Sequence, residues 1–443
     1  MSGVDRSSVP ANTDLVRHLA EPVLRANADR TVLRSFMPGD VESFVQADGL
    51  RSAQIVARVL AMNPEDLSQH LKQALDPLIA RHRDVEQTLL RHFEAVDADR
   101  STAGRANRDQ RLLIGAYFTQ EYSFESAALF NPSIVEHYDQ ADAAPGDTRF
   151  IMSLRGVGEG HVSSVTFRTG TWRADGSVTL EKASDFAVGP KVDFEELPNG
   201  RTAAHLSSGG ARDLSESVIY PFLASQGRGI EDVRLVRFTG SDGDTRYRAT
   251  FTALDGADVR QGLLQTEDFL SYEGRGVEGD LYAGKGMALF PRQIEGRYAM
   301  LSRQDNRSIF LVYSDDLYQW SGGVRLLEPE YPWEWTQLGN CGSPIEIDEG
   351  FLVLTHGVGP VRNYSIGAVL LDKNDPSRIL SRLAAPLLEP GSGERSGYVP
   401  NIVYTCGALL RGRELLVPFA VADDHTRFCT VSIDRLIAKL NRQ

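Results

Sequence analysis

The chain has 443 residues, of which 42% are apolar and 24% charged, and its 47 Lys and Arg against 60 Asp and Glu give a net charge of −13. This is the composition of a globular protein with its own core, arranged as about two to four domains or as one large repeat fold with an accessory segment. The acidic balance argues against nucleic acid or an anionic membrane as the main partner, because both attract clustered Lys and Arg.

The cysteines and the N-terminal sequence predict a reduced, cytoplasmic location. Cys341, Cys406 and Cys429 are odd in number and lack the spacing of a metal site. The opening sequence MSGVDRSSVPANTD contains no apolar core of a signal peptide, and no apolar run reaches the roughly 18 residues that span a bilayer. We therefore expect a cytoplasmic protein that does not bind membranes.

The first quarter of the chain is predicted to be helical, over residues 12–97. Asn63 followed by Pro64 is typical of a helix start, and the following leucines recur at helical spacing. Pro77 is expected to kink or divide this helix. The segment 1–110 is therefore predicted to be a helical N-terminal extension, either an accessory layer or an arm for homo-oligomerisation, and residues 97–111 are expected to connect it to the rest.

From residue 111 onward the pattern changes to short strands rich in Val, Ile, Tyr, Phe and Thr, bounded by Gly, Asp, Asn or Pro. No long helical segments separate these strands, which argues against a parallel sheet, and only the C-terminal DRLIAKLNRQ is predicted to be helical. The strands form about four or five similar groups that end in acidic turns, as in a β-propeller with long blades. A tandem β-sandwich is the alternative, and periodicity alone does not choose between them.

Polar residues gather at the ends of these strands, and a propeller would bring such positions together at one mouth of its channel. Each has an ordinary structural interpretation as a turn, a surface ion pair or a hydrogen-bonded histidine. No phosphate-binding GxxxxGK[ST], GxSxG or HExxH motif is present. The segments in question are FNP (130–132), SLRGVGEGH (153–161), IEDVR (230–234), GKGMALFPR (284–292), LSR (301–303), WEWTQLGNCGSP (333–344), THG (355–357) and VADDHT (421–426).

In this order, the segments resemble glycoside hydrolase family 130, the β-mannoside phosphorylases and β-1,2-mannosidases. FNPSIV resembles the family's FNP element, IEDVR its EDPR element with Val233 in place of proline, and KGMALFPRQIEGRYAMLSR its lysine-to-arginine segment. The resemblance extends from about residue 125 to residue 437. It implies an all-β fold, a five-bladed β-propeller over residues 111–443, with the helical segment outside the compact family pattern.

The resemblance also implies roles for individual residues. Asp232 corresponds to the proton donor, whose proton is thought to reach the glycosidic oxygen through the mannose 3-hydroxyl, unlike the usual inverting pair of carboxylates. A phosphate nucleophile requires a local group of donors in an acidic protein. The matching positions are Arg155, Lys285, Arg303, His356 and Tyr364.

Two positions depart from the family pattern. Gln337 replaces a lysine, and Ser302 replaces the histidine of a His-Arg pair. Glutamine still donates a hydrogen bond but adds no charge. Because most of the basic set is retained, phosphorolysis is favoured over hydrolysis, in which Glu125 or Glu159 would have to act as general base.

The sugar itself is expected to contact Asn131, His161 and Asp423, with Trp335 as an aromatic surface. Trp333, Tyr282 and Tyr122 are further aromatic candidates, each equally compatible with core packing. The predicted activity is inverting phosphorolysis of β-1,2-linked or related manno-oligosaccharides to α-mannose 1-phosphate, with phosphate as co-substrate and no metal or organic cofactor. The alternatives are a β-1,2-mannosidase, a non-catalytic glycan-binding propeller and a scaffold assembled through the helices.

Overall fold

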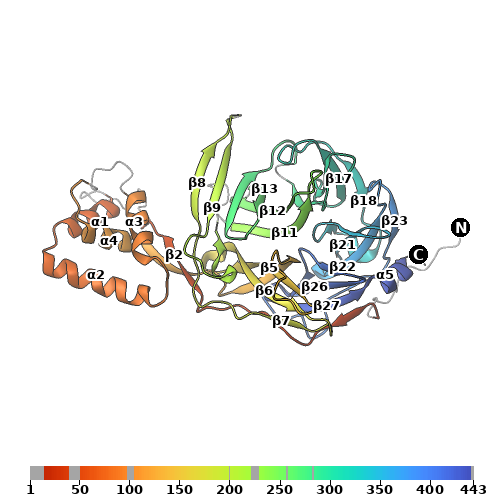
Figure 1. Cartoon of the computed structure of the whole chain (residues 1–443), viewed down its shortest axis with the longest axis horizontal. Helices are drawn as coiled ribbons and strands as arrows, with labels where there is room; N and C mark the ends of the chain where they lie inside the picture. The colour runs from red at the N-terminus through yellow and green to blue at the C-terminus, as the bar shows by residue number, and fades with distance from the viewer. Residues whose placement is uncertain are drawn as a thin grey trace.

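The structure is a computed structural model that describes residues 14–38, 50–96, 104–198, 200–220, 229–255, 258–281 and 284–440. Its β-strands form a ring of small antiparallel sheets, from which a group of helices projects to one side (Figure 1). This is the predicted five-bladed β-propeller, and the tandem β-sandwich does not form. None of the helices in these ranges combines the length and the apolar character needed to cross a membrane.

The first strands of successive blades contact one another, since β11 (Gly229–Thr239) contacts both β4 (Ala128–Glu136) and β15 (Lys285–Leu289), and β15 contacts β19 (Gln337–Asn340). The first blade consists of β4 (Ala128–Glu136), β5 (Thr148–Val157), β6 (Ser163–Trp172) and β7 (Val178–Leu180). The second consists of β11 (Gly229–Thr239), β12 (Thr245–Asp255), β13 (Asp258–Thr266) and β14 (Ser271–Gly276). These two blades join into one sheet, because Gly229 of β11 pairs with Ser163 of β6.

The third blade consists of β15 (Lys285–Leu289), β16 (Tyr298–Arg303), β17 (Ile309–Ser314) and β18 (Val324–Leu327). The fourth consists of β19 (Gln337–Asn340), β20 (Ile345–Ile347), β21 (Gly350–Val358), β22 (Tyr364–Leu371) and β23 (Ile379–Arg382). Buried apolar side chains fill the space between these two blades, among them Phe290, Leu301 and Phe351. Stacking around the ring therefore covers both faces of each small sheet.

The last blade is completed by the N-terminal part of the chain. It consists of β24 (Val403–Tyr404), β25 (Leu409–Arg411), β26 (Glu414–Val421), β27 (His425–Ser432) and β1 (Val16–His18). β1 pairs antiparallel with β27, with Val16 opposite Val431. Hydrogen bonds between segments from both ends of the chain therefore hold the ring closed, and the predicted C-terminal helix follows as α5 (Ile433–Leu440).

The helical region leaves the propeller and returns to it through a pair of strands. β2 (Thr31–Ser35) pairs with β3 (Thr119–Ser123), and between them lie the helices α1 (Arg51–Leu60), α2 (Pro64–Ile79), α3 (Val85–Val96) and α4 (Arg108–Tyr117). The expectation of helix throughout residues 12–97 was wrong at β1 and β2, whose strand pairing overrides local propensity. Part of the expected connector, residues 97–103, lies outside the described residues, and α4 crosses the proposed division at residue 110.

Local sequence explains how these helices begin and pack. The side chain of Asn63 accepts a hydrogen bond from the backbone N–H of Asp66 at 2.9 Å, which confirms the predicted start of α2. Pro77 does not divide the helix, because it lies in the last turn and α2 continues to Ile79. Gly115 of α4 lies so close to α3 that an added Cβ would be 2.0 Å from the Leu89 carbonyl oxygen.

Two further strands extend the outer edge of the second blade. β8 (Lys191–Glu196) and β9 (Thr202–Ser207) form a hairpin, and β9 pairs with β14. The hairpin stands out from the ring in Figure 1. The short β10 (Val218–Ile219) pairs with β6.

Candidate active site

Bulges in three of the inner strands position the central residues. The pairing register shifts between Phe130 and Ser133 in β4, between Glu231 and Arg234 in β11, and between Lys285 and Ala288 in β15. Asn131, Asp232 and Gly286 lie in these bulges with φ values of 49°, 51° and 73°. A bulge reorients the side chain that it carries, and such features concentrate at functional sites.

Asp232 is held from two sides and stays partly accessible. The side-chain amide of Asn131 donates a hydrogen bond to Oδ1 of Asp232 at 2.6 Å, and a guanidinium nitrogen of Arg234 lies 3.6 Å from Oδ2. Arg234 is itself buried, where it donates to the Tyr404 hydroxyl at 3.0 Å and to the Cys341 carbonyl at 3.1 Å. The Asp232 side chain keeps 25% of its exposure, so a substrate can reach this oriented carboxyl group.

Three of the predicted phosphate-binding residues form a continuous row across the third and fourth blades. Arg303, at the end of β16, donates a hydrogen bond to Nε2 of His356 in β21 at 3.1 Å. The His356 ring stacks on Tyr364, with 6.0 Å between centroids and 14° between planes. Burial and the adjacent Arg303 hold the pKa of His356 well below its usual value, so the neutral imidazole accepts this bond.

Gln337 takes part in this row as an acceptor. With its amide oxygen turned toward Arg303, Gln337 accepts hydrogen bonds from Nε of Arg303 at 3.0 Å and from Nη2 at 2.9 Å. The residue that replaces the family's lysine therefore orients a cation instead of adding one. Gly339 makes room for the row, because a Cβ there would be 2.5 Å from Cε1 of His356.

The two other predicted cations, Lys285 and Arg155, differ in whether a carboxylate pairs with them. Lys285 pairs with Arg303 across β15 and β16, and no carboxylate of the described residues lies within ion-pair distance of it. Arg155 forms an ion pair with Glu231, donates to the Ser163 hydroxyl at 2.8 Å and lies over the Phe130 ring. Glu231 therefore pairs directly with Arg155, whereas Lys285 acts on Glu231 only through a longer-range electrostatic interaction.

Asp423 belongs to the same electrostatic environment, at the turn between β26 and β27. Burial raises the pKa of Asp423 to about 7; Asp232 and Glu231 reinforce this shift, while Arg155 and Arg362 oppose it. A carboxyl group in this state is partly protonated at neutral pH and can donate a hydrogen bond. The structure thus places a second carboxyl group in the electrostatic environment of Asp232.

The remaining predicted sugar contacts lie farther out. The ring of His161 is within 2.6 Å of the Tyr398 hydroxyl, in loops of the first and last blades. Trp335 is 62% exposed and donates to the Glu330 carbonyl. No described hydrogen bond connects either residue to Asp232 or to the row of Arg303, His356 and Tyr364.

Several other candidates have structural contacts. Trp333 packs against Gly357 and Gly367 and donates to the Ala384 carbonyl at 2.9 Å. Tyr122 is buried, and Tyr282 lies outside the described residues.

The two glutamates proposed for a hydrolase also differ. Glu125 is fully buried between Arg30 and Arg168, at 3.1 Å and 2.7 Å, which removes it as a general base. Glu159 lies in the exposed loop after β5, where its backbone carbonyl accepts a hydrogen bond from Tyr122.

Sequence reasoning missed Glu231, Arg234 and Tyr404, which orient the predicted residues. Glu231 and Arg234 flank Asp232 in the quoted IEDVR segment, and their charges were the available signal. Nothing in the sequence indicated that Tyr404 would contact Arg234, 170 positions away.

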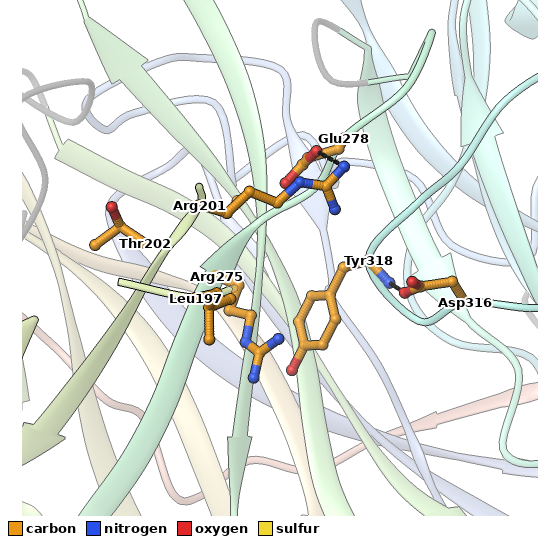
Figure 2. A pocket seen from close by; sticks show the side chains of 8 residues that line it. Leu197, Arg201, Thr202, Arg275, Glu278, Asp316 and Tyr318 are labelled. Atoms are coloured by element: carbon orange, nitrogen blue, oxygen red, sulfur yellow. Dashed lines mark hydrogen bonds and ion pairs between the residues drawn. The ribbon is translucent and has the colours of Figure 1, made fainter. Parts of the chain in front are cut away.

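A separate cavity of about 290 Å³ lies beside the β8–β9 hairpin and contains none of these residues. Figure 2 shows Arg201 reaching Glu278 and the guanidinium of Arg275 beside the Tyr318 ring. Arg275 also forms an ion pair with Glu273 at 2.5 Å. Both arginines of this cavity therefore have carboxylate partners.

Comparison with known proteins identifies the family of this chain. The model of glycoside hydrolase family 130, described as beta-1,4-mannooligosaccharide phosphorylase, matches residues 183–442. A 1,2-beta-oligomannan phosphorylase of Thermoanaerobacter sp. (strain X514) is 34% identical over 44% of this chain and 66% of its own length. A beta-1,2-mannobiose phosphorylase of Listeria innocua is 34% identical over 50% of this chain and 63% of its own length. The chain thus spans less than two thirds of these relatives.

Solved structures give the same result over a larger part of the chain. The beta-1,2-mannobiose phosphorylase from Listeria innocua, in complex with beta-1,2-mannobiose, covers 72% of this chain and 93% of its own, with 26% identity and a TM-score of 0.51. A putative glycoside hydrolase from Bacteroides ovatus, at 18% identity and a TM-score of 0.53, supports the fold alone. Because the family model matches more than half of the residues of this chain, the chain belongs to glycoside hydrolase family 130.

Proposed function

We propose that this protein is a β-mannoside phosphorylase that cleaves β-1,2-linked or related manno-oligosaccharides with inversion and releases α-mannose 1-phosphate. The observation that carries the proposal is the row of Arg303, His356 and Tyr364, with Lys285 beside it, near an oriented Asp232. Relatives at 34% identity are phosphorylases of β-1,2-linked mannosides, which supports the same substrate class.

In the proposed reaction, a phosphate oxygen attacks the anomeric carbon of the terminal mannose as the bond from that carbon to the glycosidic oxygen breaks. The bonding electrons go to the leaving oxygen, which takes a proton from the mannose 3-hydroxyl, and that hydroxyl takes a proton from Asp232. Asn131 and Arg234 keep the Asp232 carboxyl group in position. Attack from the face opposite the leaving group converts the β-linkage into the α-phosphate.

The cationic row stabilises the nucleophile. Lys285 and Arg303 supply positive charge, Tyr364 supplies a hydroxyl, and neutral His356 positions Arg303. Charged donors form the stronger hydrogen bonds to phosphate oxygens, and burial strengthens them further. No metal or organic cofactor takes part in this proposal, and the cytoplasmic location and assembly through the helices stay predictions.

The deciding experiment incubates the protein with β-mannobioses of different linkage, with and without phosphate. The proposal predicts mannose 1-phosphate only when phosphate is present. Free mannose in the absence of phosphate would instead identify a β-1,2-mannosidase. Binding without any turnover would identify a glycan-binding propeller.

A further inference from the structure

The loop between β21 and β22 has an unfavourable backbone conformation at its tip. In the short 3₁₀ turn Pro360–Arg362, both Val361 and Arg362 are in the left-handed region, with φ values of 58° and 53°. This region disfavours residues other than glycine, and β-branched ones most of all. Val361 is 85% exposed, so its side chain gains little from burial in return. Such strain in an exposed loop points to a functional constraint on the position of a neighbouring group.

That neighbouring group is the guanidinium of Arg362, which extends the cationic row. Its central carbon lies 5.8 Å from the centroid of the Tyr364 ring. Tyr364 stacks on His356, and His356 contacts Arg303. Arg362 therefore lies at the outer, solvent-facing end of a row whose inner end is Arg303.

The charge of Arg362 is available to a ligand. In the described part of the chain, no carboxylate lies within 4.0 Å of its guanidinium, whereas Arg155 is paired with Glu231. It also acts electrostatically on Asp423, where its positive charge opposes the rise of the Asp423 pKa. Like Lys285 and Arg303, Arg362 thus has no carboxylate within ion-pair distance among the described residues, and the rings of His356 and Tyr364 separate it from Arg303.

A phosphate-binding site requires positive charge of the kind that Arg362 carries. A phosphate dianion needs several charged donors, while Gln337 contributes no charge and Arg155 is neutralised by Glu231. We propose that Arg362, at the outer end of the row beside Tyr364, binds the incoming phosphate. This inference rests on the proposed phosphorylase function, which it deepens by naming a further phosphate-binding residue.

The test compares Arg362→Gln with Arg307→Gln in the full chain. Arg307 is an exposed arginine in the loop between β16 and β17, so the control removes the same charge. Phosphate affinity is measured by calorimetry, and KM for phosphate and for β-1,2-mannobiose by initial rates. Losing one hydrogen bond to a charged group should weaken phosphate binding about tenfold or more in Arg362→Gln and leave KM for mannobiose within about twofold.

The outcomes separate this inference from the proposed function. Equal phosphate affinity in Arg362→Gln and the wild-type protein, or equal losses in both variants, would overturn the role of Arg362 alone. Mannose release without phosphate by the wild-type protein would overturn the proposed function instead. Circular dichroism and thermal unfolding check that both variants are folded, and partial recovery of phosphate affinity in Arg362→Lys would support a charge effect.

Discussion

Two regions of the molecule place arginines beside an aromatic ring, yet their chemistry differs. In the cavity of Figure 2, Arg201 pairs with Glu278, and Arg275, over the Tyr318 ring, pairs with Glu273. In the candidate active site, Arg303 contacts the neutral side chains of His356 and Gln337. The first arrangement is neutral and joins parts of the second and third blades, whereas the second retains a net positive charge. The partners of an arginine, more than its exposure, therefore distinguish a structural role from a ligand-binding one.

The largest effect is expected at the proton donor. Asp232→Asn keeps the size of the side chain but removes its acidic proton, so phosphorolysis of β-1,2-mannobiose should fall by about 10²- to 10⁴-fold, the usual contribution of a general acid. Initial rates at saturating phosphate measure this loss. Full activity in the variant would contradict the proposed mechanism, and an unchanged unfolding temperature would confirm that the fold is intact.

The next effect is expected at the inner end of the cationic row. Arg303→Gln removes a charge that has no carboxylate partner in the described structure, so KM for phosphate should rise by roughly 10- to 100-fold. The binding of mannobiose should change much less. Arg275→Gln, in the cavity of Figure 2, is the matched control, and similar increases in both variants would contradict the contrast between the two regions.

The pH dependence should reveal the buried carboxyl group of Asp423. With its pKa raised to about 7, Asp423 is neutral below this pH and gains a negative charge above it, near Asp232, Glu231, Arg155 and Arg362. The added charge repels phosphate, so KM for phosphate should rise as the pH increases through 7. Asp423→Asn should remove this step, and a pH profile identical to that of the wild-type protein would assign the step to another group.

The smallest effect is expected in the cavity of Figure 2. Because the Arg275–Glu273 ion pair is partly exposed, Arg275→Gln should lower the free energy of unfolding by only about 0–1 kcal/mol. Both KM values should stay within about twofold of the wild-type values. Denaturant unfolding and initial rates measure the two effects, and a large increase in KM for phosphate would show that this cavity also serves the reaction.

Much of the fold could be predicted from the sequence, because strand alternation and turn residues are local signals, whereas the choice of a five-bladed propeller over a tandem β-sandwich came from the family resemblance. The propeller, α5 and the start of α2 at Asn63 were confirmed. The strands β1 and β2 were not predicted, since three to five residues carry little pattern of their own. β1 exists because β27 offers it hydrogen bonds from the opposite end of the chain.

The candidate site was predictable in part for a different reason. The FNP segment contains Asn131, and the IEDVR segment contains Asp232. In the structure these two residues, 101 positions apart in the chain, are joined by a hydrogen bond. The sequence showed neither that Glu231 neutralises Arg155 nor that Gln337 orients Arg303. These contacts depend on how neighbouring blades align at the bulges, which local spacing does not encode.

By itself, the sequence determined the strand-rich architecture and the acidic net charge, which depend on composition and on patterns within a few residues of each other. The set of residues expected to handle a proton and an anion followed from the family resemblance. Only the tertiary structure decided which cations are paired and which are free, because that depends on side chains brought together from different blades. A net charge of −13 is thus compatible with a local cationic site, since the ring gathers Lys285, Arg303 and Arg362 from separate strands and loops.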